Sequence, residues 1–383
     1  MNMKNIAIVG CGNMGGGHAL AIGYGTGYTD WQLPQIIDDE VEAVTTDISK
    51  ILHLSGIFDI DEKRQEWARG EGFHVYQSLE EILDDPEVDI VLVAVPNHLH
   101  AEISIKAMRA GKHVLCEKPV TPTSAELEEV LKVSRETGKV FYPRQNRRWD
   151  PDYLLVKKIY DEQLAGKPLS LENRIGGGGA DGPFGWRSEK RYGGGMMLDW
   201  GVHLIDRIVQ MNKSKIKQIF CQTINLTGTD VDEGFNLTII FEDGFIAYIE
   251  SGVGHFDSPT PGWRLNGTTG IGEVITFSGE GAKVLKAKPR DPNFVRDFNA
   301  LPVRKPVIKR GEGPSWFAAP PMNNDVIELD RPIFDRNALY KNLVDCIEGK
   351  AEQIVTGEQA LRVLKIMEAA LLSGEKNRVV DFE

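Results

Sequence analysis

The stretch "NIAIVGCGNMG", residues 5–15, decides the fold class of this chain of 383 residues. Its apolar run predicts a buried strand, which leads directly into Gly10, Gly12 and Gly15. In this spacing the first glycine permits a tight turn, the second lets the backbone approach a pyrophosphate, and the third lets a helix pack closely on the strand. A strand, this loop and a helix in succession predict a dinucleotide-binding α/β domain. The alternative is a glycine-rich turn that binds no ligand.

Apolar runs alternate with helical segments along the first third of the chain. Further strands are predicted at 54–59, 89–96, 113–118 and 140–146, with helices between them, for example at 78–85, 98–112 and 123–139. Thr123 and Glu126 form a capping-box pair at the start of the last helix, and Gly138 suits its end. Continuous apolar strands separated by helices indicate a parallel sheet that is covered on both faces. Residues 1–145 are therefore predicted to form a doubly wound Rossmann domain.

The pattern changes in the rest of the chain. Strand-like alternation dominates at 217–228, 234–253 and 272–287, and Asp243–Gly244 predicts a hairpin turn. Residues 288–335 form a Pro-rich, irregular insertion, and helices are predicted at 337–350 and 356–376. We expect residues 146–383 to form an α+β domain with a large, mostly antiparallel sheet, for substrate binding and oligomerisation. Its C-terminal helices can pack back on the first domain.

Composition limits the class of protein. A hydrophobic content of 41% and a charged content of 26% are those of a soluble globular protein. The net charge of −12 disfavours nucleic acid and anionic membranes as partners. No apolar run is long enough to span a membrane, and no secretory segment precedes the first strand. The cysteines Cys11, Cys116, Cys221 and Cys346 lie far apart, so we expect buried thiols in a reducing cytoplasm, with no disulfide and no zinc ribbon.

The second strand is expected to end in an acidic residue that binds the cofactor ribose. Asp59 follows the apolar run "LSGIF" and has that setting, although an insertion at 23–50 places it further along the chain than usual. An aspartate here favours NAD over NADP. The alternative is that Asp59 only caps a helix, a role that Asp61 could equally have.

Two further stretches carry residues suited to proton transfer. Lys118, in "EKP" (117–119), ends a strand at the edge where such sheets bind ligands, and it can donate to a substrate hydroxyl or to the cofactor. The stretch "GGGMMLDWGVHLID" (193–206) places Asp199 and His203 four residues apart, on one face of a helix. A carboxylate can fix the tautomer of an imidazole, which can act as a general base near neutrality. The alternative is a helix cap and a satisfied core histidine, and two such residues are too few for a zinc site, so we predict no metal.

These stretches, together with "AVPNHLH" (94–100), "NRRWDP" (146–151), "WR" (186–187) and "VTGEQALRVLKIMEAA" (355–370), resemble the glucose–fructose oxidoreductase / inositol dehydrogenase / MocA family. The resemblance implies that Lys118, Asp199 and His203 form the catalytic group at the nicotinamide. The residues expected to bind the cofactor are Gly10, Gly12, Asn13, Met14, Gly15, Asp59, Pro96, Asn97, His100, Glu117, Lys118, Arg147 and Trp186. The residues expected to bind the substrate are Lys118, Arg147, Arg187, Asp199 and His203.

The predicted reaction is hydride transfer between NAD and a secondary hydroxyl of a sugar, glycoside or polyol, for example C3 of a glucoside or an inositol. His203 takes the proton, Lys118 stabilises the developing alkoxide, and Asp199 orients His203 or contacts a neighbouring hydroxyl. Two alternatives stay open: an NAD-dependent glycosidase that uses transient oxidation, and a non-catalytic sugar or redox sensor. A homo-oligomer, dimer or tetramer, is expected because an exposed antiparallel sheet face needs cover.

Overall fold

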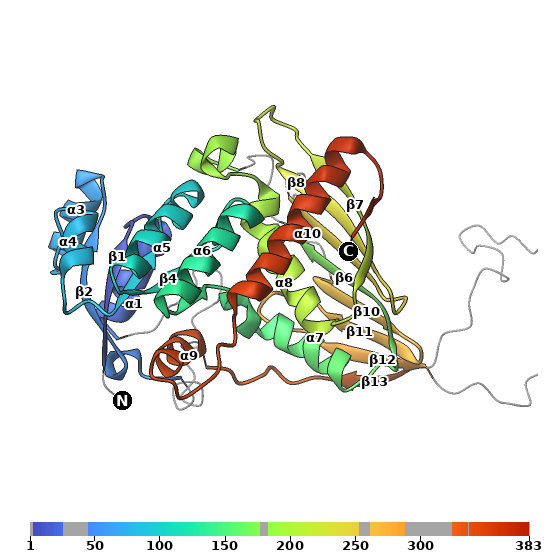
Figure 1. Cartoon of the computed structure of the whole chain (residues 1–383). Helices are drawn as coiled ribbons and strands as arrows, with labels where there is room; N and C mark the ends of the chain where they lie inside the picture. The colour runs from blue at the N-terminus through green and yellow to red at the C-terminus, as the bar shows by residue number, and fades with distance from the viewer. Residues whose placement is uncertain are drawn as a thin grey trace, which may run out of the picture.

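The computed structural model describes residues 3–25, 45–176, 183–252, 261–287, 324–335 and 337–382. The first half of the chain forms a five-stranded parallel sheet with the strand order β2-β1-β3-β4-β5 (Figure 1). Its strands are β1 (Lys4–Val9), β2 (Leu52–Phe58), β3 (Ile90–Val93), β4 (His113–Cys116) and β5 (Phe141–Pro143). The predicted doubly wound α/β class is confirmed.

The strands of this sheet are apolar throughout because both faces are covered. Ile6 and Ile8 lie in one hydrophobic core, whereas Ala7 and Val9 lie in another. The connecting elements are α1 (Asn13–Gly23), η1 (Ile48–Lys50), α3 (Glu62–Gly70), α4 (Leu79–Asp84), η2 (Asn97–Leu99), α5 (His100–Arg109) and α6 (Ser124–Thr137). The predicted capping box of Thr123 and Glu126 is present at the start of α6, and Gly138 ends that helix with φ +67°.

A helix from the far end of the chain covers part of the first sheet. In α9 (Ala338–Ile347), the side chains of Leu339, Tyr340 and Leu343 lie in the same core as Ile6 and Ile8. The C-terminal part of the chain therefore completes the packing of the first sheet (Figure 1). A domain boundary after residue 145 stays a prediction; it falls just beyond β5.

The second sheet has nine strands in the order β13-β12-β11-β10-β6-β9-β8-β7-β14. All neighbouring strands are antiparallel except the parallel pair of β6 and β9. The strands are β6 (Pro168–Ile175), β7 (Ile216–Ile224), β8 (Gly234–Phe241), β9 (Ile246–Gly252), β10 (Trp263–Gly267), β11 (Gly270–Val274), β12 (Lys283–Ala287), β13 (Asn324–Glu328) and β14 (Val380–Asp381). Gly244, with φ +86°, lies in the hairpin predicted between β8 and β9.

Helices cover one face of the second sheet. They are α7 (Pro151–Asp161), α8 (Val202–Met211) and α10 (Gly357–Lys376), and Figure 1 shows them side by side in front of the strands. The short helices η3 (Asn146–Trp149), η4 (Gly185–Ser188) and η5 (Lys190–Tyr192) and the π-turn η6 (Met197–Gly201) join these layers to the first sheet. No helix in the described ranges is long and apolar enough to cross a membrane.

The structure corrects the description of 288–335 as irregular. Asn324–Glu328 forms β13, which pairs with β12 at the edge of the sheet. A five-residue edge strand of this kind is determined by its pairing partner rather than by its own pattern. The rest of the insertion, residues 288–323, and residues 26–44 of the insertion predicted at 23–50 lie outside the described residues.

Candidate active site

The glycine-rich loop has the close contacts expected of a dinucleotide site. Gly10 adopts φ +92°, and a Cβ there would lie 2.6 Å from the carbonyl oxygen of Ala94. A Cβ on Gly15 would collide with the carbonyl of Gly10, whereas a Cβ on Gly12 would meet nothing within 4 Å. Gly12 is the N-cap of α1 and has no side chain that could accept from the first turn, which holds Asn13 and Met14. The glycine loop at the N-terminus of this helix fits a pyrophosphate, since the backbone can approach a ligand closely there.

Asp59 lies against this loop. It directly follows β2, and its Oδ2 accepts a hydrogen bond from the backbone N–H of Cys11 at 2.6 Å. Its Oδ1 accepts from the N–H of Asp61 at 2.8 Å. Asp61 itself is the N-cap of α3, where it accepts from the N–H of Lys63. The helix cap is thus Asp61, and binding of a ribose by Asp59 stays a prediction.

Asn97 and His100 join three segments that are far apart in the sequence. The Nδ2 of Asn97 donates to the carbonyl of Gly193 at 2.7 Å, across the two halves of the chain. The ring nitrogens of His100 lie 2.8 Å from the carbonyl oxygens of Pro119 and Val95. The loop that begins at Pro96 is therefore fixed to the segment that carries Lys118 and to the glycines that precede α8.

Glu117 is a buried anchor, 4% exposed. Its Oε1 lies 2.8 Å from Nε2 of His18 and 3.0 Å from Nη1 of Arg144. Burial alone would raise the pKa of Glu117, but the charges and hydrogen bonds of Arg144 and His18 outweigh it and hold the pKa well below its ordinary value. Burial and Arg144 lower the pKa of His18 to about 4, so its neutral ring bridges Glu117 and the hydroxyl of Tyr340 in α9.

Lys118 and Asp199 meet across the two halves of the chain. The Nζ of Lys118 donates to Oδ1 of Asp199 at 2.6 Å and to the carbonyl oxygen of Asp199 at 2.8 Å. The Nε of Arg187 lies 3.5 Å from the same Oδ1, and its guanidinium stacks on the ring of Trp186 at 4.4 Å. Burial raises the pKa of Asp199, but the charges of Lys118 and Arg187 outweigh that effect and hold the pKa below its usual range.

His203 lies on the next turn, and Asp199 contacts Lys118 and Arg187 instead of its ring; the alternative role of Asp199, contact with a substrate hydroxyl, stays a prediction. The backbone at Met197–Gly201 is a π-turn, which interrupts the four-residue register of an α-helix. The ring of His203 is 3% exposed, and its Nδ1 lies 3.0 Å from Oε1 of Gln145. Burial, together with the charges of Lys118, Arg147 and Arg207, lowers the pKa of His203 well below its ordinary value.

Arg147 lies inside the protein. It is 7% exposed, and its guanidinium stacks on the rings of Trp200 at 4.6 Å and Phe277 at 4.8 Å. Its Nη1 also lies 3.1 Å from Oδ2 of Asp150. These contacts hold the turn before α8 against the second sheet, while a role in binding cofactor or substrate stays a prediction.

The described residues contain no group of three or more His, Cys, Asp or Glu side chains placed to hold a metal ion. Cys11, Cys116 and Cys221 are buried free thiols, and Cys346 is half-buried.

The sequence matches two family models. Residues 4–145 match the model described as "Oxidoreductase family, NAD-binding Rossmann fold", and residues 153–273 match the "GFO/IDH/MocA C-terminal domain". A crystal structure of an NAD-binding protein from Listeria innocua is 32% identical, with a TM-score of 0.80, and the match covers 99% of this chain and 97% of that one. The chain belongs to the Gfo/Idh/MocA family of oxidoreductases.

Two curated proteins that are similar in sequence to this Gfo/Idh/MocA protein have more specific names. The scyllo-inositol 2-dehydrogenase (NADP(+)) IolW of Bacillus subtilis is 27% identical over 81% of this chain and 83% of its own length. The levoglucosan dehydrogenase of Pseudarthrobacter phenanthrenivorans is 33% identical over 54% of this chain, which spans only 50% of that relative.

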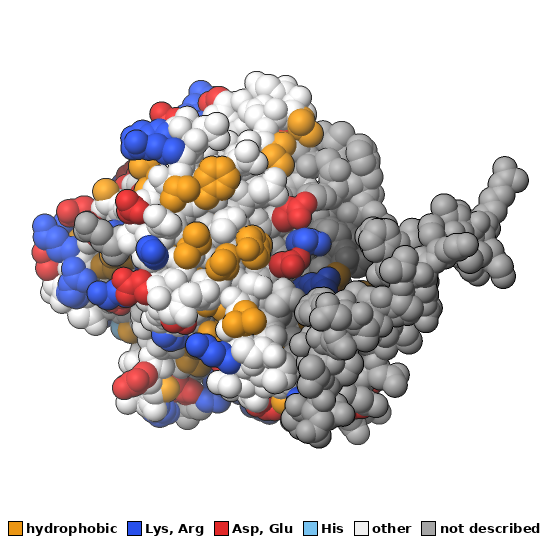
Figure 2. Space-filling model, turned by 90° about the vertical axis from the view of Figure 1, so that its right-hand side faces the viewer, with side chains coloured by type: hydrophobic (Ala, Val, Ile, Leu, Met, Phe, Trp, Pro, Cys, Tyr) orange, Lys and Arg blue, Asp and Glu red, His pale blue; other side chains and the backbone are white. Residues whose placement is uncertain are grey.

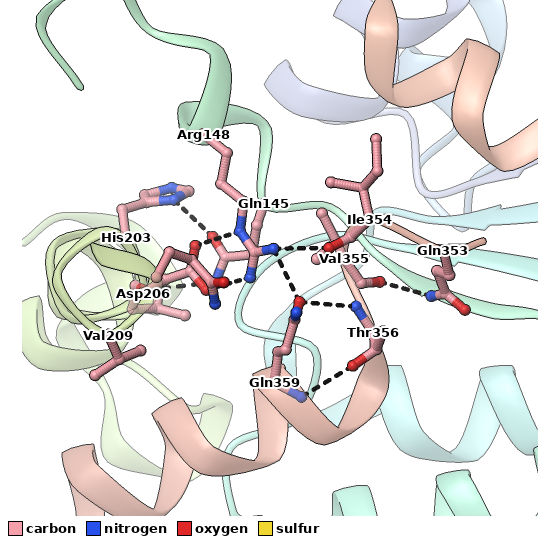
Figure 3. A network of polar contacts seen from close by, with 12 residues as sticks. Gln145, Arg148, His203, Asp206, Val209, Gln353, Ile354, Val355, Thr356 and Gln359 are labelled. Atoms are coloured by element: carbon pink, nitrogen blue, oxygen red, sulfur yellow. Dashed lines mark hydrogen bonds and ion pairs between the residues drawn. The ribbon is translucent and has the colours of Figure 1, made fainter. Parts of the chain in front are cut away.

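The side chains that hold α8 in place in this Gfo/Idh/MocA protein are not evident from its sequence. Arg148 is buried, and its guanidinium forms a two-point contact with Asp206 at 2.8 and 2.6 Å (Figure 3). Arg148 also donates to Oε1 of Gln359, the residue that completes the capping box of α10 with Thr356. The stretch "QNRRWDP" (145–151) carries Gln145 and Arg148, but their partners lie about 60 and 200 residues away along the chain, so no local pattern could assign them.

Proposed function

We propose that the protein transfers a hydride between NAD and a secondary hydroxyl of a sugar, glycoside or polyol. One observation carries this proposal. Lys118 lies just beyond the carboxyl end of β4, its Nζ is 2.6 Å from Oδ1 of Asp199, and His203 follows on the next helical turn. An ammonium, a carboxylate and an imidazole thus gather at the strand ends that also carry the glycine-rich loop. Ligands bind at this edge in open parallel sheets.

The residues present fit a dinucleotide. When bound, a nicotinamide dinucleotide supplies the acceptor or donor of the hydride. Gly10, Gly12 and Gly15, with Asn13 and Met14, would hold its pyrophosphate, and Asp59 would accept from a ribose hydroxyl. The carboxylate of Asp59 would repel a 2′-phosphate, which supports NAD rather than NADP.

The proton of the substrate hydroxyl would pass to Nε2 of His203. The lowered pKa keeps this imidazole neutral at neutral pH, so one ring nitrogen carries a lone pair. The ammonium of Lys118 would donate a hydrogen bond to the same oxygen and stabilise its negative charge as the proton leaves. Asp199 would hold that ammonium in position, because its carboxylate contacts both Lys118 and Arg187.

The names of the relatives support the substrate class. One is a dehydrogenase of scyllo-inositol and the other of levoglucosan, so a polyol and an anhydrosugar are both represented. We include an inositol and C3 of a glucoside among the candidate positions. Binding several neighbouring hydroxyls requires several polar groups, and Lys118, Arg187 and Asp199 already converge here.

The test is reduction of NAD and of NADP with a panel of inositols, glycosides and anhydrosugars, followed by the absorbance of the reduced nicotinamide. His203→Asn and Lys118→Ala should lower kcat about a hundredfold, and His203→Asn should leave the dissociation constant of NAD nearly unchanged. Lys106→Ala, on the exposed face of α5, is the control and should behave as the wild type. Binding of NAD with no reduction by any member of the panel would contradict the proposal, and release of an aglycone without net reduction would indicate the glycosidase instead.

We also propose that the protein is cytoplasmic and forms a homo-oligomer. Three buried free thiols support a reducing compartment, which cell fractionation can test. Exposed apolar side chains on the outer face of the second sheet support the oligomer.

A further inference from the structure

Gln145 lies between β5 and η3, and both the nitrogen and the oxygen of its side-chain amide contact α8. The side chain is 3% exposed. Its Nε2 donates to the carbonyl oxygen of Val202 at 3.3 Å, and its Oε1 lies 3.0 Å from Nδ1 of His203 (Figure 3). Both contacts are to the helix that carries the proposed base.

These two contacts determine where the proton of the imidazole lies. A backbone carbonyl can only accept, so the NH₂ end of the amide must face Val202. The oxygen of the amide therefore faces Nδ1 of His203, and that nitrogen must carry the hydrogen. A neutral imidazole has one N–H, so Nε2 carries the lone pair.

We propose that Gln145 is a positioning residue that fixes His203 as the Nδ1–H tautomer and leaves Nε2 as the proton acceptor. In the described part of the chain, Nε2 of His203 has no hydrogen-bonding partner. The role of Nε2 as acceptor rests on the proposed function, whereas the tautomer itself follows from the contacts of Gln145 alone.

An amide fixes the tautomer without adding a charge beside the ring. His203 is surrounded by cationic side chains, Lys118, Arg144, Arg147 and Arg207, which disfavour a charged ring. A carboxylate at Nδ1 would also accept from Nδ1–H, but it would raise the pKa of the ring and make Nε2 a stronger base. An uncharged acceptor fixes the same tautomer and leaves the ring neutral.

The surrounding structure holds both contact partners of Gln145. The two-point contact of Arg148 with Asp206 fixes α8 one turn beyond His203, and Arg148 is tied in turn to the N-terminal turn of α10 through Gln359 (Figure 3). The ring of Trp200 lies edge-on to the imidazole, with the ring centroids 6.0 Å apart. The imidazole is thus held by packing as well as by the amide.

The direct test is the tautomer of His203 in the full-length protein. Nitrogen-15 NMR of histidine-labelled protein distinguishes the protonated from the unprotonated ring nitrogen, and His203→Asn assigns the signals by their loss. We expect the hydrogen on Nδ1 and the lone pair on Nε2 at neutral pH. The opposite tautomer, or a protonated ring, would overturn the proposal without reference to any enzymatic activity.

Variants at Gln145 test whether the amide sets the tautomer. Gln145→Leu should give a mixture of tautomers and lower kcat about tenfold, with little change in KM, because one hydrogen bond to the base is lost. Gln145→Glu keeps an acceptor at Nδ1 and should restore the Nδ1–H tautomer. Gln353→Leu is the matched control, since that amide donates to the carbonyls of Phe141 and Val355 and does not touch His203.

The outcomes separate this inference from the proposed function. If Gln145→Leu keeps a pure Nδ1–H tautomer, the inference is wrong even where activity falls. If the wild type shows the expected tautomer but His203→Asn keeps full activity, the role of His203 as base is wrong and the assignment of Gln145 stands.

Discussion

Asp59 and Glu117 are both acidic residues next to a strand end of the first sheet, yet their surroundings differ. The oxygens of Asp59 accept two backbone N–H groups, from Cys11 and Asp61, and a carboxylate can accept further hydrogen bonds. Glu117 is enclosed by His18 and Arg144. We infer that Asp59 is the acid available to a ligand and that Glu117 holds the backbone beside Lys118.

This difference gives a prediction for cofactor choice. Asp59→Ser should lower the ratio of kcat/KM for NAD to that for NADP at least about tenfold, because the carboxylate no longer accepts from the ribose or repels a phosphate. Asp61→Ser is the matched control, since serine caps a helix as well as aspartate does and should leave both the ratio and the stability unchanged. The measurement is initial rates with each cofactor. An unchanged ratio in Asp59→Ser would show that Asp59 only stabilises the glycine-rich loop and does not contact the cofactor ribose.

At the scale of elements, the π-turn η6 depends on one side chain from the loop between β7 and β8. Oδ2 of Asp232 accepts from the N–H of Met197 at 2.7 Å, and its backbone carbonyl accepts from the N–H of Met196 at 2.9 Å. Gly195 has φ +110°, and a Cβ there would collide with Oδ1 of Asp232. Only glycine therefore permits this approach, which explains one of the three glycines that precede the turn.

Asp232 makes the stability of the folded protein depend on pH, and the sign of this dependence follows from the burial of its side chain. Burial raises the pKa of Asp232 to about 6, above the value of about 3.9 for an unfolded chain. The ionised form is thus disfavoured in the folded state, and stability is lost as the pH rises through 6. Asp232→Asn keeps an oxygen for Met197 without a charge, so it should be more stable than the wild type by about 1–2 kcal/mol at pH about 8 and lose this advantage near pH about 4.

Urea unfolding of both proteins across this pH range is the measurement. The exposed Asp230→Asn, two residues away, is the control for the same Asp-to-Asn change outside the contact with Met197. A constant difference between Asp232→Asn and the wild type at every pH would mean that Asp232 titrates as it does in the unfolded chain.

The elements that could be predicted from the sequence are those with a local cause. The strands of the first sheet are continuous apolar runs, and α6 has its capping box and terminal glycine. The edge strand β13 and the π-turn could not be predicted, because a distant partner determines each of them. The candidate site follows the same division: Lys118 and His203 stand in recognisable motifs, whereas Gln145 is identified only by the atoms that it contacts.

At the scale of the whole molecule, a helix near the C-terminus is bound to the first sheet and to the first helix of the chain. Tyr340 in α9 bonds to His18 in α1, and Asn342 accepts from the hydroxyl of Tyr142 in β5. The helix that begins at the glycine-rich loop is therefore held by a helix near the C-terminus. Loss of packing at α9 would therefore disturb both the glycine-rich loop and, through His18 and Glu117, the position of Lys118.

The outer face of the second sheet carries both apolar and charged side chains, the charged ones including Glu172, Arg174 and Glu250. The register places half-buried or exposed side chains opposite one another on this face, away from α7, α8 and α10; they are Phe220, Ile240, Ile246, Tyr248, Ile271, Leu285 and Val326. Figure 2 shows hydrophobic patches among charged groups on the corresponding side of the molecule. Exposed apolar side chains on a sheet face are typical of an interface, and a second copy of the chain offers the same face with two-fold symmetry.

Tyr248 lies on β9 near the middle of this face, and it is 43% exposed in the single chain. We expect Tyr248→Glu to raise the dissociation constant of the oligomer about a hundredfold, because pairing would bury two uncompensated charges. The fold itself should persist, since the side chain is open to solvent in the monomer. Ile60→Glu, 90% exposed beyond β2, is the control and should leave the assembly intact. Sedimentation velocity over a range of concentrations measures both, and a wild type that sediments as a monomer, or a Tyr248→Glu variant that assembles as the wild type does, would show that this face is not the interface.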